Sequence, residues 1–262
     1  MPLPAFRFKK FDVAQAGAAH PVGTDAVLLG AWADVRGITH FLDIGTGTGV
    51  VALMLAQRSC SGDFSRSNAE DRIWKGVAVE IHPPSATLAR ENFAASPWAK
   101  RLEVWESSIQ AFANIDSLTS SETINMDWPI KPFDLIVSNP PFFSELTTSP
   151  DKTRSLGRHT ATLSPSDLLK CVSHLLAPTG KFCAILPEFE GRRLCELSVP
   201  QGLYWTRIAE VRSRPGKPIE RLLLQFEKSP YIFQREEFSI YAGKTGDEYS
   251  KVFQAMTRDF YL

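Results

Sequence analysis

The residues best suited to chemistry in this sequence are Asn139, Pro140, Pro141 and Phe142, which directly follow the apolar run 133–138. Two consecutive prolines stiffen the backbone and remove two N–H donors, and the residue before a proline is held in extended geometry. The turn therefore presents the Asn139 amide oxygen and the Pro140 carbonyl as acceptors, with the Phe142 ring beside them. Such a site fits a planar NH2 group, which either a nucleobase or a glutamine side chain supplies.

A second candidate site is the glycine-rich run from Gly45 to Gly49, which follows the apolar strand predicted at 40–44. Its glycines permit a tight turn and a close approach of a ligand to the backbone, and the helix predicted after it offers unpaired N–H groups. A nicotinamide-binding loop reads G-x-G-x-x-G, whereas this loop reads G-x-G-x-G and directly follows Asp43 and Ile44. The spacing resembles the first motif of the class I S-adenosylmethionine-dependent methyltransferases, in which an acidic residue and the loop amides bind the amino-acid end of the cofactor.

Glu80 lies near the end of the next predicted strand, 76–81, where a carboxylate is the expected partner of the ribose hydroxyls of a nucleoside cofactor. Its separation from the glycine loop exceeds the usual ~20 residues, and the polar stretch 59–75 accounts for the excess. A solvated charge at a strand end is the structural alternative for this residue.

The pattern of apolar residues predicts strands that alternate with helices, which favours an α/β sheet with helices on both faces. Strands are predicted at 40–44, 76–81, 102–105, 133–138, 181–186, 204–211 and 222–226, and helices at 50–58, 84–95, 165–176 and 247–262. We expect a Rossmann-like sheet of seven strands, mostly parallel with one antiparallel strand. The polar, aperiodic stretches 59–75 and 114–131 indicate surface insertions.

We expect one domain over residues 1–262, because no stretch reads as a linker. Within it, 1–36 is expected to form an N-terminal segment over the cofactor, 37–228 the catalytic core, and 229–262 a C-terminal strand and helix.

The composition is that of an ordinary globular protein, with 44% hydrophobic residues, 22% charged residues and a formal net charge of zero. The overall charge therefore gives no general attraction to nucleic acid. No apolar run is long enough for a membrane helix, and the first ten residues lack the apolar core of a signal peptide. The four cysteines and five histidines show no metal-ligand spacing. We expect a cytoplasmic monomer with reduced thiols, no metal and no membrane contact.

Any contact with nucleic acid would need a local basic patch. Five basic residues gather near the two last predicted strands, and three more follow the Asn-Pro-Pro-Phe turn. They are Arg207, Arg212, Arg214, Lys217 and Arg221 in the first group, and Lys152, Arg154 and Arg158 in the second. A solvated charged face is an equally good interpretation of any one of them.

Taken together, these motifs resemble the bacterial adenine-N6 methyltransferases of valine tRNA, which modify adenine 37 of the anticodon loop. The resemblance covers most of the chain. It is carried by Gly23–Ala33, Phe41–Arg58, Glu91–Trp98, Asn139–Phe142 and the C-terminal Phe260-Tyr261-Leu262.

The resemblance implies S-adenosylmethionine as cofactor and tRNA as partner. It implies cofactor contacts from Thr24, Asp43, Gly45, Gly47, Gly49, Glu80, Ser108 and Asn139. It implies catalytic roles for Asn139, Pro140 and Phe142, and substrate contacts from Pro141 and Arg158.

Three positions depart from the family pattern. Ser108 stands where the family usually has an Asp that receives the cofactor adenine, and Glu106 is a nearby substitute. Phe142 replaces the more common Tyr, so the stacking face is kept and the hydroxyl is lost. The run 15–21 lacks the charged residues that the family usually has before Gly23.

The Asn-Pro-Pro-Phe turn alone leaves other functions open. Methylation of a glutamine amide in a release factor uses the same turn, although that family typically carries a separate N-terminal helical domain. Methylation of guanine N2 in RNA would use the same chemistry. A module that binds the cofactor or RNA without turnover is a further alternative, which the complete turn disfavours, and the glycine spacing disfavours an oxidoreductase.

Overall fold

The computed structural model describes residues 3–18, 20–60, 74–113, 132–140 and 163–260. The strands are β1 (Phe6–Arg7), β2 (Asp12–Val13), β3 (His40–Ile44), β4 (Lys75–Glu80), β5 (Leu102–Glu106), β6 (Phe133–Ser138), β7 (Leu176–Pro187), β8 (Tyr204–Arg212), β9 (Arg221–Glu227) and β10 (Gln234–Ser239). The helices are α1 (Thr24–Trp32), α2 (Val50–Cys60), α3 (Pro83–Ala94), α4 (Ile109–Phe112), α5 (Pro165–Leu175), α6 (Glu188–Ser198) and α7 (Lys251–Thr257), with a 3-10 turn at Val199–Gln201.

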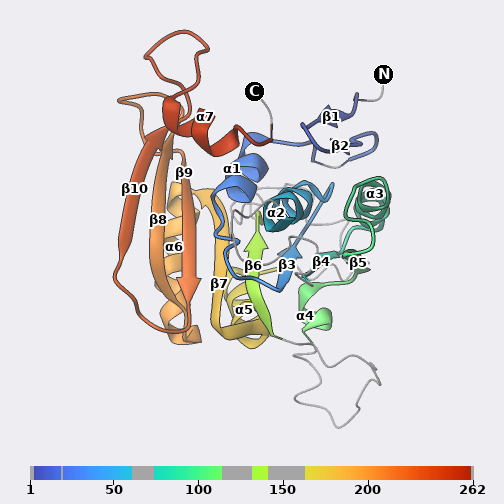
Figure 1. The fold of residues 1–262 in the computed structure, drawn as a ribbon. Coiled ribbons are helices and arrows are strands. Elements are labelled where there is room, and N and C mark those ends of the chain that lie inside the picture. The colour runs from blue at the N-terminus through green and yellow to red at the C-terminus, as the bar shows by residue number, and fades with distance from the viewer. Residues whose placement is uncertain (1–2, 19, 61–73, 114–131, 141–162, 261–262) are drawn as a thin grey trace, which may run out of the picture.

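The centre of the fold is one twisted sheet with the strand order β10-β8-β9-β7-β6-β3-β4-β5 (Figure 1). β9 pairs antiparallel with both β7 and β8, whereas the other pairs in this sheet are parallel. The doubly wound α/β fold with one antiparallel strand is confirmed. The sheet has one strand more than expected, because β10 extends it beyond β8.

Apolar side chains fill both faces of the sheet. One buried cluster contains side chains of α1 and α2 together with Phe93 of α3 and Phe253 of α7. The other contains side chains of α4, α5 and α6. Figure 1 shows α1 and α2 on one side of the sheet and α5 and α6 on the other. The central strands are therefore buried on both faces, which is why they read as continuous apolar runs.

Three predicted elements differ in extent. The C-terminal helix was expected over 247–262, but α7 covers Lys251–Thr257, because the Ser250 hydroxyl caps it and Tyr249 pairs with Tyr241 in an isolated bridge. β7 begins directly after α5, at Leu176, and so includes the residues expected to stop that helix. Ser59 and Cys60 belong to α2 and Lys75 begins β4, while 61–73 and 114–131 lie outside the described residues.

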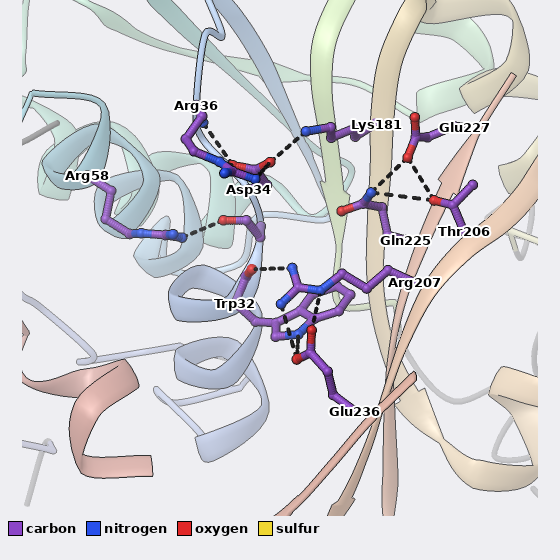
Figure 2. Close-up of polar contacts among 11 residues, drawn as sticks. Trp32, Asp34, Arg36, Arg58, Lys181, Thr206, Arg207, Gln225, Glu227 and Glu236 are labelled. Atoms are coloured by element: carbon purple, nitrogen blue, oxygen red, sulfur yellow. Dashed lines mark hydrogen bonds and ion pairs between the residues drawn. The ribbon is translucent and has the colours of Figure 1, made fainter. Parts of the chain in front are cut away.

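α1, for which the sequence predicted no helix, is fixed to the sheet by polar contacts near its C-terminal end (Figure 2). The Arg207 guanidinium of β8 lies 4.1 Å from the centroid of the Trp32 ring and donates to both oxygens of Glu236 in β10, at 2.7 and 3.1 Å. Trp32 Nε1 donates to the same carboxylate at 3.3 Å. The helix, β8 and β10 therefore share one polar cluster.

A second anchor follows α1 at Asp34, which accepts from Lys181 of β7 at 2.6 Å and from Arg36 at 2.8 Å. Although burial raises the pKa of the Asp34 carboxyl, the hydrogen bonds from Arg36 and Lys181 hold it well below its ordinary value. Arg58 of α2 donates to the Ala33 carbonyl at 2.6 Å and so joins the two helices. Because these contacts hold the C-terminal end of α1, the position of the residues at its start is fixed as well.

Among the described helices, none has the length and apolar character needed to cross a bilayer. The described residues also contain no group of three His, Cys, Asp or Glu side chains that could hold a metal ion. Cys60, Cys171, Cys183 and Cys195 are all free thiols.

Candidate functional site

The glycine loop begins where β3 ends, at the carboxyl edge of the sheet. Its three glycines all have positive φ: +71° at Gly45, +56° at Gly47 and +83° at Gly49. A Cβ at Gly45 or Gly47 would meet no atom within 4 Å, so the backbone there is open to a ligand. A Cβ at Gly49 would lie 2.6 Å from the Phe93 ring, so this glycine serves the packing of α2 against α3.

Asp43, two residues before the loop, is buried inside β3. Thr46 Oγ1 donates to Asp43 Oδ2 at 2.6 Å, and the Ala52 backbone also donates to this carboxylate. Burial raises the pKa of Asp43 to about 7, against the opposing effect of these hydrogen bonds. In this structure Asp43 therefore braces the loop from inside. Thr46 was not among the residues predicted from the sequence, although its place within the loop was a signal for it.

Glu80, at the end of β4, contacts the same loop. Gly47 N donates to Glu80 Oε2 at 2.9 Å, and His82 N donates to Oε1 at 2.9 Å. The carboxylate is buried and its position is set by two backbone groups. The next residue, Ile81, is 49% exposed although its side chain is large and apolar. From the sequence, Ile81 was predicted only to be a strand residue.

Ser108 follows β5 at the same edge of the sheet and caps α4, because its hydroxyl accepts from the Ala111 backbone at 3.1 Å. Glu106 forms an exposed ion pair with Arg90 of α3 at 3.4 Å. A contact of either residue with the cofactor adenine stays a prediction.

Asn139 lies directly beyond β6 and is half-buried, and Pro140 after it is buried. Ser138 Oγ donates to the Ile44 carbonyl at 3.0 Å, which ties the end of β6 to the start of the glycine loop. The structure thus brings Asn139 to the same edge as Gly45, Gly47 and Glu80. Pro141, Phe142 and Arg158 lie outside the described residues.

A cavity of about 430 Å³ opens beside Asn139. Its other walls come from the start of α1, including Thr24 and Asp25, from the ends of β8 and β9, and from Ile240. Thr24, expected at the cofactor, therefore lines this cavity together with Asn139. Its contact with a cofactor stays a prediction.

The strand order separates the loop from the cavity. The glycine loop and Glu80 follow β3 and β4, on one side of β6, while the cavity walls from β8 and β9 lie on the other side. Asn139, at the end of β6, lies between them. The site can therefore hold two ligands that meet at this residue.

The arginines of the first expected basic group are bound within the fold. Arg207 pairs with Glu236, Arg212 with Glu237, Arg214 with Asp247, and Arg221 with Asp25. Arg214 also lies 4.4 Å from the centroid of the Tyr241 ring. These contacts favour the structural interpretation of this group over an RNA-binding patch. Lys152, Arg154 and Arg158 lie outside the described residues.

Asn92 of α3 is a supporting residue that the sequence analysis missed. Its amide donates to the Thr48 carbonyl at 2.8 Å and accepts from the Ala14 backbone at 2.8 Å. It therefore connects the N-terminal segment to the glycine loop. Its place within the segment Glu91–Trp98, which carries part of the family resemblance, was the available signal.

Comparison with curated proteins finds relatives that match over nearly their whole length. The chain is 37% identical over 257 residues, 98% of each chain, to the tRNA1(Val) (adenine(37)-N6)-methyltransferase of Photobacterium profundum. It is 38% identical to the protein of the same name from Bacteroides fragilis, over 100% of this chain and 99% of that one. The protein of that name from Klebsiella pneumoniae is 38% identical, over 100% and 96%.

Solved structures with similar folds are methyltransferases of low sequence identity. A predicted O-methyltransferase of Agrobacterium tumefaciens has a TM-score of 0.60 and 17% identity, covering 90% of this chain and 96% of that one. A ribosomal protein L11 methylase of Lactobacillus delbrueckii has a TM-score of 0.50 and 16% identity, covering 82% of both chains. These structural similarities show that the chain has the same fold as these proteins. No protein-family model matches the chain.

Proposed function

The chain belongs to the family of tRNA1(Val) (adenine(37)-N6)-methyltransferases, and from this membership we propose that it methylates N6 of adenine 37 in the anticodon loop of valine tRNA, with S-adenosylmethionine as methyl donor. The observation that carries the proposal is the position of Asn139. It lies between the glycine loop, where a cofactor can approach open backbone, and a cavity large enough for a second ligand.

The residues at the glycine loop fit S-adenosylmethionine. Open backbone at Gly45 and Gly47 can receive the amino-acid end, and the Glu80 carboxylate has lone pairs for ribose hydroxyls beyond those used by the two amides. The exposed Ile81 side chain provides an apolar surface for a ring. When bound, the cofactor supplies a methyl group that is already activated for transfer.

The protein's main task is then to align the amine and stabilise its charge. The lone pair of an adenine N6 is delocalised into the ring, so the amine is a poor nucleophile. The Asn139 side-chain oxygen and the Pro140 carbonyl would each accept one amine hydrogen, which favours a more tetrahedral nitrogen. The same two oxygens would stabilise the positive charge that develops there. The positively charged N6 formed first is acidic and can release its proton to water, so no strong base is needed.

Phe142 would hold the target base by stacking, which contributes ~1–3 kcal/mol per base. Pro141 and Arg158 are the remaining proposed substrate contacts. An unpaired base of an anticodon loop costs less to extrude than a base in a duplex. A substrate that costs little to extrude does not require a strongly basic protein, which agrees with the net charge of zero. Because tRNA is the substrate, we propose that the protein acts in the cytoplasm.

The test is to incubate the protein with radiolabelled S-adenosylmethionine and total RNA from a strain that lacks the enzyme, and to digest the RNA to nucleosides. We expect label in N6-methyladenosine, recovered from valine tRNA. Purified release factors serve as the parallel substrate. Label in release factor alone would exclude the proposal in favour of glutamine methylation, and label in N2-methylguanosine would indicate the guanine reaction.

A further inference from the structure

The cavity beside Asn139 is lined by both apolar and polar side chains. Leu28, Val211 and Ile240 contribute apolar lining, while Thr24, Ser213 and Glu220 contribute polar lining. A volume of about 430 Å³ lies within the range of small-molecule pockets. A nucleoside, with a flat apolar base and a hydroxyl-bearing sugar, needs both kinds of lining.

Two charged side chains from distant parts of the chain meet in the wall of the cavity. Arg221 Nε, at the start of β9, donates to Asp25 Oδ2 in the first turn of α1 at 2.8 Å. The carboxylate is 25% exposed, so it is held in place and still reaches the cavity. Among the described residues, Arg221 forms the ion pair with Asp25. One carboxylate oxygen is thus oriented by the arginine, and the other can accept from a ligand.

The charges of this wall disfavour a phosphate. Asp25 and Glu220 are both acidic, and the guanidinium of Arg221 is paired with the first of them. Arg212 also lines the cavity, but its guanidinium is directed to Glu237 and Glu210, at 3.3 and 3.8 Å. Carboxylates accept hydrogen bonds and donate none when ionised. The wall therefore favours a ligand group that carries hydroxyl donors.

We propose that Asp25, oriented by Arg221, accepts a hydrogen bond from the 2′-hydroxyl of the nucleotide to be methylated, and so selects RNA over DNA. Within a nucleic acid chain the 3′ and 5′ oxygens are esterified, so the 2′-hydroxyl is the sugar donor that remains. The inference rests on the proposed function. It adds that the cavity recognises the ribose of the target nucleotide.

The test uses full-length valine tRNA assembled by ligation, with either adenosine or 2′-deoxyadenosine at the methylated position and ribose elsewhere. We expect the deoxy substrate to be methylated about ten- to a hundredfold more slowly, the loss typical of one hydrogen bond to a charged group. Equal rates on the two tRNAs would overturn the inference and leave the proposed function intact. No methylation of the all-ribose tRNA would overturn the proposed function, and the inference with it.

Variants of the protein test whether Asp25 causes the preference for ribose over deoxyribose. In Asp25→Ala we expect the ratio of the two rates to approach one, with the rate on the deoxy tRNA and the dissociation constant of S-adenosylmethionine unchanged. Glu196→Gln is the matched control, because Glu196 is an exposed carboxylate on α6 that pairs with Arg193, away from the cavity walls. It should keep the wild-type ratio. If Asp25→Ala slows both tRNAs equally, or weakens only cofactor binding, the assignment of Asp25 to the ribose is wrong.

Discussion

The Glu80 carboxylate and the Gly47 amide form a direct hydrogen bond of 2.9 Å, which joins the end of β4 to the glycine loop after β3. Because the His82 amide holds the other oxygen at 2.9 Å, the carboxylate is oriented before any ligand arrives. A residue proposed to bind the cofactor ribose therefore also sets the shape of the loop proposed to bind the other end of the cofactor. The geometry of the loop and the proposed ribose contact therefore depend on the same side chain.

Replacing Glu80 by Gln should weaken both functions, because an amide offers one acceptor oxygen where two backbone N–H groups need acceptors. We expect the free energy of unfolding to fall by about 1–3 kcal/mol and the affinity for S-adenosylmethionine to fall at least about tenfold. Chemical denaturation and titration calorimetry measure the two effects. Glu103→Gln, an exposed carboxylate on β5, is the control and should change neither. Unchanged cofactor affinity in Glu80→Gln would argue against a ribose contact.

Asn139→Ala should abolish transfer and leave cofactor binding largely intact, because the side chain is proposed to act on the amine. Loss of one positioned group that stabilises developing charge typically lowers kcat by about 10²–10³-fold. Single-turnover rates and the dissociation constant of S-adenosylmethionine are the measurements. Surviving turnover with collapsed cofactor binding would reverse the role assigned to Asn139.

Gly49→Ala should destabilise the fold more than a substitution at another glycine of positive φ. The added Cβ would lie 2.6 Å from the Phe93 ring, whereas at Gly37, with φ +74°, it would meet nothing within 4 Å. Gly37→Ala thus reports the backbone cost alone, about 1–2 kcal/mol. We expect urea denaturation to show a clearly larger loss for Gly49→Ala. Equal losses would mean that Phe93 moves aside without cost.

The raised pKa of Asp43 predicts how the free energy of unfolding changes with pH. Burial raises the pKa of Asp43 to about 7 in the folded protein, above the ordinary value of 3.8 that we take for the unfolded chain. Between these values the folded state holds a proton that the unfolded state has released, so this group's contribution to stability falls as pH rises to about 7 and is constant above it. Asp43→Asn has no such proton. The difference in unfolding free energy between wild type and variant should change by at most about 1.4 kcal/mol per pH unit, and a difference independent of pH would contradict the raised pKa.

Arg207→Lys should loosen the attachment of α1 although it keeps the charge. Lysine lacks the planar fork that binds both oxygens of Glu236 and stacks on Trp32. We expect a loss of about 1–3 kcal/mol in the free energy of unfolding. Arg193→Lys, in an exposed pair with Glu196, should change it by less than about 0.5 kcal/mol. Similar effects of both substitutions would mean that the cluster at Trp32 adds little.

The sequence predicted the bounds of β3 and β6 correctly, because each is an apolar run that ends in residues suited to turns. It missed α1, because all residues of that helix from Ala26 to Trp32 are buried and no polar stripe marks its period. It predicted a strand within 229–262 but not the bounds of β10 or its place at the sheet edge, because its charged residues hide the alternation of a strand.

Local sequence was enough to place the glycine loop, Glu80 and Asn139 at the ends of strands, where the structure has them. The contact between Asp25 and Arg221 joins residues 196 positions apart, and no local pattern reveals it. The roles of Thr46 and Asn92 also depend on which backbone groups the fold brings to them.

The additional strand β10 has a consequence for how copies of this protein meet. It forms one edge of the sheet, and edge strands offer unpaired backbone groups that can recruit another chain. Three consecutive charged residues, Arg235, Glu236 and Glu237, lie along this edge, and each is bound to a partner on β8. A strand from a second molecule would therefore add beside a row of charged side chains and not beside an apolar surface. β10 therefore protects the sheet against edge-to-edge aggregation while it holds α1 in place.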